Sequence, residues 1–236
     1  MNYPKSEAYR AYHDRIMGPN PMKLTEELLL CHQIPAGAAV MDLGSGQGVT
    51  SLFLAREYGF RVWAADLWSD PAEIQAFFDT AGPAGERLTP VHADAAALPF
   101  APESFDAVVS VDSYHYFGRD PEFLDTRLLP FLKPGGWVYI AIPGMKRDCH
   151  DHLPEALRRS WTPEDLDTIH DAAYWRRILS GTKGAALRSL REMESNEECW
   201  ADWIQCENPY AVGDRKAIEA GACRYLNFLA IVLQKH

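Results

Sequence analysis

The hydrophobic residues of this chain fall into short apolar runs that alternate with amphipathic stretches. Strands are expected where several apolar and β-branched residues follow one another, and helices where apolar residues recur every three or four positions. The apolar runs predict seven strands, at 38–43, 61–65, 88–92, 105–111, 137–142, 186–193 and 226–233. This alternation is typical of βαβ units, which build a mostly parallel sheet with helices on its faces.

Turn and capping residues place helices between the strands. The dipeptides Asp70-Pro71 and Asp120-Pro121 are each typical of an N-cap followed by proline in the first helical turn. Helices are predicted at 25–32, 49–58, 70–81, 120–132 and 162–179. Residues 194–222 are too many for a plain hairpin between the last two strands, so we expect a helical insertion that covers the site.

Composition and charge narrow the class of protein. The 236 residues suffice for one α/β domain with a small appendage, and 47% hydrophobic and 24% charged residues are ordinary for a globular protein. The net charge of −10 disfavours nucleic acid and anionic membrane surfaces as partners. Neither a membrane span nor a signal peptide is expected from the hydropathy, which favours a cytoplasmic location. Five cysteines without a C-x-x-C pair indicate reduced thiols and no metal site.

The most specific stretch is Asp42-Leu43-Gly44-Ser45-Gly46-Gln47-Gly48, between the first apolar run and a helical pattern. Alternate glycines let the backbone turn sharply and approach a bound molecule, since no Cβ intervenes. A dinucleotide loop, G-x-G-x-x-G, would carry its third glycine where Val49 stands. Asp42 would also repel a pyrophosphate, whereas a carboxylate suits a ligand that carries an ammonium group.

The pattern D-x-G-x-G-x-G resembles the first motif of class I S-adenosylmethionine-dependent methyltransferases. Four further stretches match this family in order and spacing: Asp66 at the second strand end, His92–Phe100, Phe105–Val111 and Leu132–Gly136. The resemblance covers roughly the first 145 residues well and the rest loosely. It implies a three-layer Rossmann-like α/β fold with a seven-stranded, mostly parallel sheet whose last strand is antiparallel.

The same resemblance implies a division of the chain and a cofactor. Residues 1–35 would form an N-terminal helical cap, 36–145 the cofactor-binding core and 194–222 a helical lid, all within one domain. The cofactor would be S-adenosyl-L-methionine, with its ribose on Asp66, its adenine on Asp94 and its methionine half on the glycine loop. The predicted cofactor contacts are Asp42, Gly44, Ser45, Gly46, Asp66, Leu67, Asp94, Ala95 and Val111.

The acceptor should lie just after the fourth strand, where the methyl group would project. His115 titrates near neutrality and is a candidate general base, or else a histidine packed beside aromatic rings. Tyr114 and Tyr116 either shape the pocket, where their ring faces attract cations, or belong to the core. Trp200 and Trp203 share one helix face and form either a substrate wall or packing.

Residues of two further segments are candidates for closing the cofactor pocket. Those of the N-terminal segment are Tyr9, Tyr12, His13 and Lys23. Trp68, two residues past the predicted ribose ligand, covers either the adenine or the sheet edge.

The predicted function is methyl transfer from S-adenosylmethionine to a small-molecule acceptor. A nucleotide-dependent oxidoreductase is an alternative, which Val49 and Asp42 count against. A cofactor-binding regulator without turnover is a second alternative. The chain also distantly resembles cyclopropane fatty-acid synthases, but those proteins place a Glu-His pair where this chain has His115-Tyr116, which disfavours lipid cyclopropanation.

Overall fold

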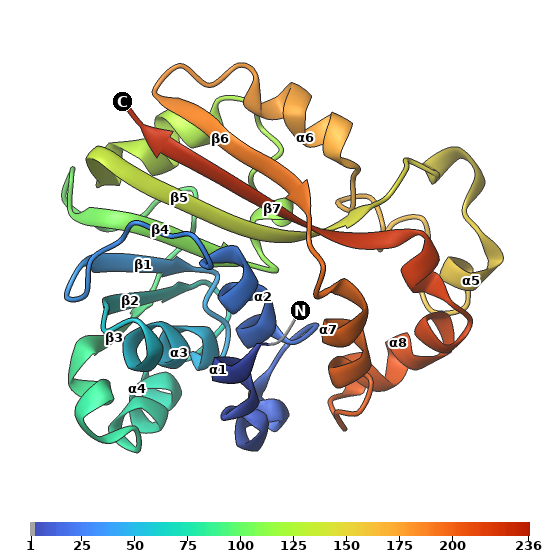
Figure 1. The fold of residues 1–236 in the computed structure, drawn as a ribbon, viewed down its shortest axis with the longest axis horizontal. Coiled ribbons are helices and arrows are strands. Elements are labelled where there is room, and N and C mark those ends of the chain that lie inside the picture. Colours follow the sequence, from blue (N-terminus) through green and yellow to red (C-terminus); the bar gives the residue numbers. More distant parts are fainter. Residues whose placement is uncertain (1–2) are drawn as a thin grey trace.

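The computed structural model describes residues 3–236; the first two residues of the predicted cap lie outside the described part. One seven-stranded sheet runs through the molecule, with helices on both of its faces (Figure 1). Its strands are β1 (Ala39–Leu43), β2 (Arg61–Asp66), β3 (Leu88–His92), β4 (Phe105–Val111), β5 (Leu132–Met145), β6 (Ala185–Glu192) and β7 (Leu226–Lys235). All seven predicted strands are present.

The strand order is β3-β2-β1-β4-β5-β7-β6. Strands β1 to β5 pair in parallel, while β7 runs antiparallel to both β5 and β6. The predicted fold class and the antiparallel last strand are therefore confirmed. The chain leaves β1 toward β2 on one side and returns on the other side at β4, and such a reversal opens a crevice at the carboxyl ends of the strands.

Eight α-helices are described in residues 3–236. They are α1 (Pro4–Glu7), α2 (Pro21–Leu28), α3 (Val49–Glu57), α4 (Pro71–Asp79), α5 (Glu155–Arg158), α6 (Ala172–Leu179), α7 (Asn196–Trp203) and α8 (Pro209–Glu219). Short 3₁₀ turns cover Arg10–Arg15, Gly82–Arg87, Tyr114–Tyr116, Leu129–Phe131, His150–His152 and Ala222–Arg224. Helices α7 and α8 form the predicted insertion between β6 and β7. No helix in this part of the chain has the length and apolar character needed to cross a membrane.

Three predicted helices differ from the structure. Helix α2 begins at Pro21 instead of 25, because the Asn20 side chain caps it by accepting from the amides of Met22 (3.1 Å) and Lys23 (3.2 Å). The predicted helix at 120–132 is a π-helical turn, Leu124–Leu128, followed by a 3₁₀ turn. Pro130 explains this ending, since it has no N–H to continue the helical hydrogen bonds.

The predicted helix at 162–179 begins only at Ala172. Thr162 and Asp165 bond to each other in a local turn: the Thr162 amide donates to the Asp165 carboxylate (2.8 Å), and the Asp165 amide donates to the Thr162 hydroxyl (3.2 Å). Asp171 then caps the true helix by accepting from the Tyr174 amide at 2.9 Å. The reciprocal bonds of Thr162 and Asp165 form a capping box, but only a short turn follows it. The His170 carbonyl accepts from the Met145 amide at 3.2 Å and Asp171 pairs with Met145, which holds residues 170 and 171 against the end of β5 and separates the turn from the helix.

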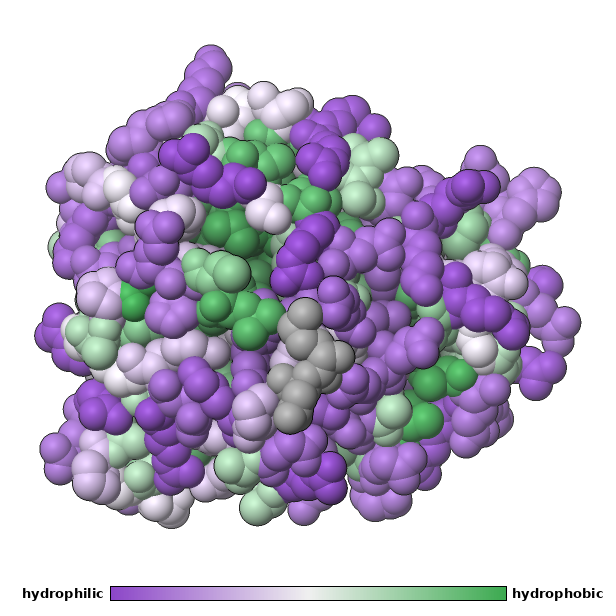
Figure 2. Space-filling view, viewed as in Figure 1, coloured by the Kyte–Doolittle hydropathy of each residue, from purple (hydrophilic) through white to green (hydrophobic). Residues whose placement is uncertain are grey.

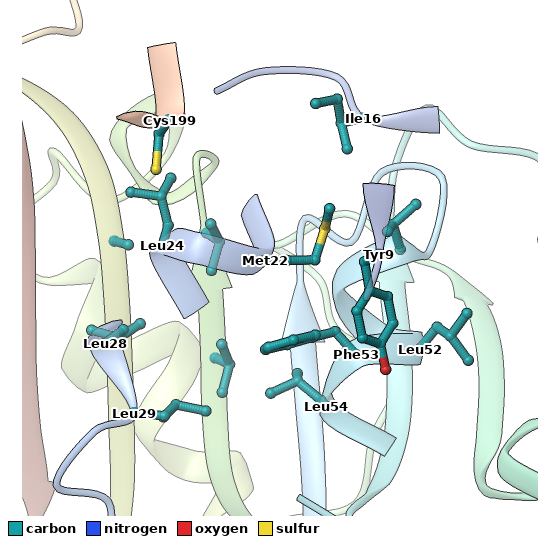
Figure 3. Close-up of a cluster of buried hydrophobic side chains, with 14 of the residues drawn as sticks. Tyr9, Ile16, Met22, Leu24, Leu28, Leu29, Leu52, Phe53, Leu54 and Cys199 are labelled. Carbon is teal, nitrogen blue, oxygen red and sulfur yellow. The ribbon is translucent and has the colours of Figure 1, made fainter. Parts of the chain in front are cut away.

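Two apolar clusters fill the spaces on the two faces of the sheet, since successive strand residues point to opposite sides. In one cluster, Met22 and Leu24 of α2 lie between Phe53 of α3 and Cys199 of α7 (Figure 3). Helix α2 thereby joins the sheet to the helical insertion. Polar residues dominate the face seen in Figure 2, with apolar residues gathered above α2 over the middle of the sheet.

Candidate active site

The glycine loop turns sharply at the carboxyl end of β1. Gly44 and Gly48 have φ of 77° and 81°, in the left-handed region that favours glycine. A Cβ on Gly44 would lie 1.8 Å from the Ser113 hydroxyl oxygen, and one on Gly48 would lie 2.8 Å from the ring of Phe78. These two glycines therefore let the loop pack against the end of β4 and against α4.

Asp66 locks this loop to the end of β2. The Gly46 amide donates to its Oδ2 (2.9 Å), and the amides of Trp68 (2.9 Å) and Ser69 (2.8 Å) donate to its Oδ1. Each carboxylate oxygen can accept more than one bond, so ribose hydroxyls can still donate to Asp66. A pyrophosphate would need the Gly46 amide and would meet a negative charge there. The geometry thus fits a nucleoside better than a dinucleotide.

Asp42 lies beneath the loop and not in the cleft. Its side chain is only 1% exposed, and the Ser51 hydroxyl of α3 donates to Oδ2 at 2.6 Å. Burial raises the pKa of Asp42 to about 7. The sequence suggested that Asp42 faces a ligand's ammonium group; instead it supports the turn from below, because its carboxyl group points to α3.

A cleft opens between the glycine loop, the end of β4 and the N-terminal segment. Its lining residues are Arg15, Ile16, Met17, Gly18, Pro19, Pro21, Gly44, Ser45, Gly46, Gln47, Val49, Thr50, Val111 and Asp112. Four predicted cofactor residues, Gly44, Ser45, Gly46 and Val111, are among them. The N-terminal segment closes this side, although through residues other than the four that the sequence suggested.

Those four residues hold the segment in place. The Tyr9 hydroxyl donates to Glu57 at 2.9 Å, and Lys23 pairs with Asp202 of α7 at the same distance. Tyr12 packs edge-on against Phe77, and burial lowers the pKa of His13. They fasten the cap to α3, α4 and α7 and do not line the cleft.

The remaining predicted cofactor residues lie at the ends of β2 and β3. Leu67 and Asp94 are exposed, and Ala95 is half-buried. Because Asp66 and His92 are paired in the parallel register of β2 and β3, these residues share the edge at which the glycine loop lies. The Ala96 amide donates to Asp94 Oδ1 at 2.8 Å, which leaves the outer oxygen of that carboxylate for a ligand.

Arg15 is a cleft residue that sequence reasoning missed. Its guanidinium group lies 4.2 Å over the ring of Phe77, and its Nε has no hydrogen-bond partner among residues 3–236. A guanidinium binds carboxylates through paired N–H donors, so Arg15 suits the carboxylate of an amino acid. The N-terminal segment carries no motif that marks this residue.

Asp112 forms the wall of the cleft opposite the loop. It follows β4 with φ of 56°, and its amide donates to Ala141 at 2.8 Å. A Cβ on Gly18 would come within 2.0 Å of its Oδ2, so only glycine allows the N-terminal segment to lie on this carboxyl group. Left-handed backbone at a non-glycine residue costs about 1–3 kcal/mol and often occurs at functional sites. Burial, followed by the charge of Asp214, raises the pKa of Asp112 to about 8.

The three aromatic residues after Asp112 and Ser113 have different surroundings. Tyr114 is 1% exposed and packs against Phe123 and Trp175 in the core. His115 is also buried, its Nδ1 has no partner within the described chain, and burial lowers its pKa to about 3. Only Tyr116, at 56% exposed, faces the solvent. The structure therefore does not support Tyr114 as a pocket residue or His115 as an effective base at neutral pH.

Trp200 and Trp203 are buried in the helical insertion. The Trp203 indole donates to Asp214 Oδ2 (2.9 Å), and the indole of Trp161 donates to Oδ1 (2.8 Å). Trp200 packs beside Trp161, with 5.8 Å between the ring centroids. Both predicted tryptophans therefore pack inside the insertion, as the second alternative expected. The indoles of Trp203 and Trp161 bind the carboxylate of Asp214, a residue that sequence analysis did not single out.

Hydrogen bonds join the insertion to the N-terminal segment. The Asn20 amide group donates to Asp202 Oδ2 at 2.7 Å, and Asn208, the N-cap of α8, donates to the Ile16 carbonyl at 3.3 Å. Met17 accepts from Gln47 of the glycine loop at 3.3 Å. The insertion thus borders the mouth of the cleft.

Asp148, His150 and His170 are the one group in residues 3–236 that could offer three metal ligands. They lie outside the cleft lining. Both ring nitrogens of His150 already face acceptors, Asp148 Oδ1 at 2.7 Å and the Leu166 carbonyl at 3.0 Å. Burial lowers the pKa of His150, but these two bonds outweigh burial and raise it. The arrangement fits a protonated histidine, and we assign no metal to it.

Comparisons with known proteins agree with this fold and this loop. Residues 40–136 match a family model described as a methyltransferase domain. The fatty-acid O-methyltransferase of Mycolicibacterium smegmatis is 35% identical over 180 residues, which cover 73% of this chain and 60% of that protein. Methyltransferase GfsG of Streptomyces halstedii is 31% identical over 120 residues, or 50% of this chain and 42% of that protein.

Solved structures show the same fold. Phosphoethanolamine N-methyltransferase 2 of Haemonchus contortus, solved with S-adenosyl-L-methionine, superposes with a TM-score of 0.72 at 20% identity, over 99% of this chain and 57% of that chain. This chain belongs to the class I S-adenosylmethionine-dependent methyltransferase superfamily. It spans about half the length of the curated relatives that it matches.

Proposed function

We propose that this protein transfers a methyl group from S-adenosylmethionine to a small-molecule acceptor. The observation that carries the proposal is the glycine loop whose Gly46 amide is held by Asp66 and which opens into a cleft walled by Asp112. Methyltransferases among its relatives and structural neighbours support the same activity.

Residues of the cleft and of the adjoining ends of β2 and β3 fit the parts of this cofactor. Asp66 would accept from the ribose hydroxyls and Asp94 from the adenine amino group. Arg15 would bind the methionine carboxylate, beside the loop at Gly44–Gly46. When bound, S-adenosylmethionine supplies a methyl group that its sulfonium sulfur already activates. The protein itself must orient the acceptor toward this methyl group and exclude water from the site.

The acceptor side of the cleft supports a small molecule. The N-terminal segment and the insertion border its mouth through the Asn208 and Met17 contacts, which narrows the approach to the glycine loop. The net charge of −10 gives no electrostatic attraction to nucleic acid. Acceptors named for relatives and neighbours, a fatty acid and phosphoethanolamine, are small molecules that differ in the attacking atom.

The experiment is in two stages. Calorimetry with S-adenosylhomocysteine measures cofactor binding, and NADH and NADPH serve as competing ligands. Transfer of a labelled methyl group is then measured with panels of amines, phenols, thiols and carboxylic acids. Stabilisation by a dinucleotide without binding of S-adenosylhomocysteine would refute the proposal. Binding without transfer to any panel would favour the alternative of a regulator.

A further inference from the structure

Exposed apolar side chains gather around the glycine loop. The large apolar side chains that are exposed among residues 3–236 are Met17, Leu30, Leu67, Trp68, Tyr116, Tyr210 and Val212. Three of them, Met17, Trp68 and Tyr116, are tied to the glycine loop or to the residues that support it. Single exposed apolar residues are ordinary, whereas a group of them at an opening marks a binding site.

Two of these side chains are aromatic rings that meet at the carboxyl edge of the sheet. Trp68 follows β2 and Tyr116 follows β4, and β1 lies between those two strands. The ring centroids are 6.1 Å apart, with 70° between the ring planes. Trp68 is 81% exposed and Tyr116 is 56% exposed, so most of each ring remains free for another molecule. The two rings therefore form an open corner, with one wall from each side of β1.

Backbone contacts fix both rings beside the glycine loop. The Trp68 amide donates to Asp66 Oδ1 at 2.9 Å, and the other oxygen of that carboxylate accepts from Gly46 at 2.9 Å. The Tyr116 amide donates to the Ser113 carbonyl at 3.1 Å. Ser113 in turn packs on the loop, because its hydroxyl oxygen would lie 1.8 Å from a Cβ on the first loop glycine. The loop is thus joined to one ring on each of its sides.

Met17 extends this surface toward the N-terminal segment. It lines the cleft and is 49% exposed. Its sulfur accepts from Gln47 at 3.3 Å, and its Cγ would lie 3.8 Å from a Cβ on Gly46. A thioether is polarisable and makes favourable contacts with aromatic rings. The opening of the cleft therefore presents two rings and a thioether, none of which carries a charge at neutral pH.

We propose, on the basis of the methyl-transfer function above, that the acceptor carries an aromatic ring, which binds in the corner between Trp68 and Tyr116. Because these rings stand 70° apart, a third ring can stack on one and meet the other edge-on, the two arrangements that aromatic pairs prefer. The corner adjoins the cleft that would hold the methyl donor, since the loop that lines the cleft also supports both rings. A small polar acceptor would leave these apolar surfaces in water, whereas an aromatic one removes them from it.

The binding test uses the 236-residue chain saturated with S-adenosylhomocysteine, so that the cofactor site is filled. Calorimetric titrations compare 2-naphthol with decahydro-2-naphthol, which has the same carbon skeleton and hydroxyl group but no aromatic ring. We expect 2-naphthol to bind roughly two- to tenfold more tightly, because aromatic pairs contribute affinity beyond the area that they bury. Phosphoethanolamine should bind more weakly than either. Equal or tighter binding of decahydro-2-naphthol or of phosphoethanolamine would overturn the assignment.

Variants assign the preference to the two rings. Trp68→Leu and Tyr116→Leu should each reduce the preference for 2-naphthol, and the double variant should abolish it. Trp68→Phe and Tyr116→Phe keep a ring at each position and should preserve it. Both side chains are exposed, so these variants leave the core intact. The matched control is Leu30→Ala, which removes an exposed apolar side chain outside the cleft lining and should also preserve the preference.

Two results with these variants would refute the assignment. One is a preference for 2-naphthol that survives in the double leucine variant. The other is a phenylalanine variant that loses as much of the preference as the leucine variant at the same position, because a ring would then not be what the site requires.

The same variants test other occupants of the two rings. If Trp68→Leu weakens S-adenosylhomocysteine tenfold and leaves 2-naphthol binding unchanged, the indole covers the cofactor, and the assignment is overturned. A dimer in sedimentation that the double leucine variant no longer forms would make the corner an interface between two copies. Flotation with neutral phosphatidylcholine vesicles that the double variant loses would make it a membrane contact. Each of these two results would also overturn the assignment.

A transfer assay separates this inference from the function on which it rests. Failure of the wild-type protein to bind S-adenosylhomocysteine would end the proposed function itself. Labelled methyl transfer is measured with the matched pairs phenol and cyclohexanol, aniline and cyclohexylamine, and thiophenol and cyclohexanethiol. Transfer to the aromatic member of a pair supports the assignment. If only the cyclohexyl members accept the methyl group, methyl transfer stands and the aromatic assignment falls.

Discussion

Replacing Asp66 with alanine removes the group that joins the glycine loop, the end of β2 and the expected ribose site. The substitution deletes acceptors for three backbone amides, at 2.9 Å from Gly46, 2.9 Å from Trp68 and 2.8 Å from Ser69. It also deletes the acceptor for the ribose hydroxyls. The loop amides lie near solvent, so we expect the loss to fall mainly on cofactor binding.

The magnitude follows from the bonds that are lost. A hydrogen bond to a charged group contributes roughly 1.5–3 kcal/mol, and each 1.4 kcal/mol is about a factor of ten in affinity. One lost ribose bond therefore weakens binding by about 10–150-fold. The loop, freed from Asp66, adds the cost of ordering it again when the cofactor binds. Asp66→Asn should lie between alanine and wild type, because its amide oxygen still accepts while its NH₂ group cannot accept from Gly46.

Isothermal titration calorimetry with S-adenosylhomocysteine measures the effect. The matched control is Asp70→Ala, which removes a carboxylate four residues further along that caps α4 by accepting from the Ala72 amide at 2.8 Å. This control should lower stability by about 1 kcal/mol and leave the affinity unchanged. If a folded Asp66→Ala protein binds S-adenosylhomocysteine as tightly as wild type, the ribose assignment is wrong.

Three further substitutions test the site and its supports. Gly44→Ala places a Cβ against Ser113 at a φ of 77° and should abolish S-adenosylhomocysteine binding in calorimetry. The control is Gly135→Ala, which has a similar φ of 76° but open space around it, and it should only lower the free energy of unfolding by about 1 kcal/mol. Asn20→Ala removes the cap of α2 and should reduce the free energy of unfolding by about 1–2 kcal/mol in urea; an unchanged midpoint would contradict the capping role. Because the pKa of Asp112 is raised in the folded protein, its contribution to stability is largest below pH 4 and is lost as the pH rises through about 8. Asp112→Asn should therefore gain stability relative to wild type between pH 5.5 and pH 9, by about 1–3 kcal/mol after solvent screening, and an equal difference at both pH values in urea unfolding would refute this.

Local chemistry made much of the fold predictable from sequence. Apolar runs marked all seven strands, because the inner strands of a parallel sheet are buried on both faces and tolerate few polar residues. Asp70 and Pro71 marked the start of α4, since capping depends only on neighbouring residues. The prediction was wrong at Pro130, where a missing N–H interrupts the helical bonds. It was also wrong between Thr162 and Asp171, where backbone pairing of residues 170 and 171 with Met145 of β5 separates a short turn from the helix.

By itself the sequence determined the glycine loop and Asp66 at the end of the next strand. A sharp turn that brings the backbone close to a ligand requires glycine at every second position, as at Gly44, Gly46 and Gly48. Only the tertiary structure decided that Asp42 lies beneath the loop, that His115 is buried and that Arg15 enters the cleft. It also placed Gly18 of the N-terminal segment against Asp112 at the end of β4, two residues far apart in the chain. Contacts of that kind depend on how helices and strands pack over long sequence separations, and no local pattern of residues records them.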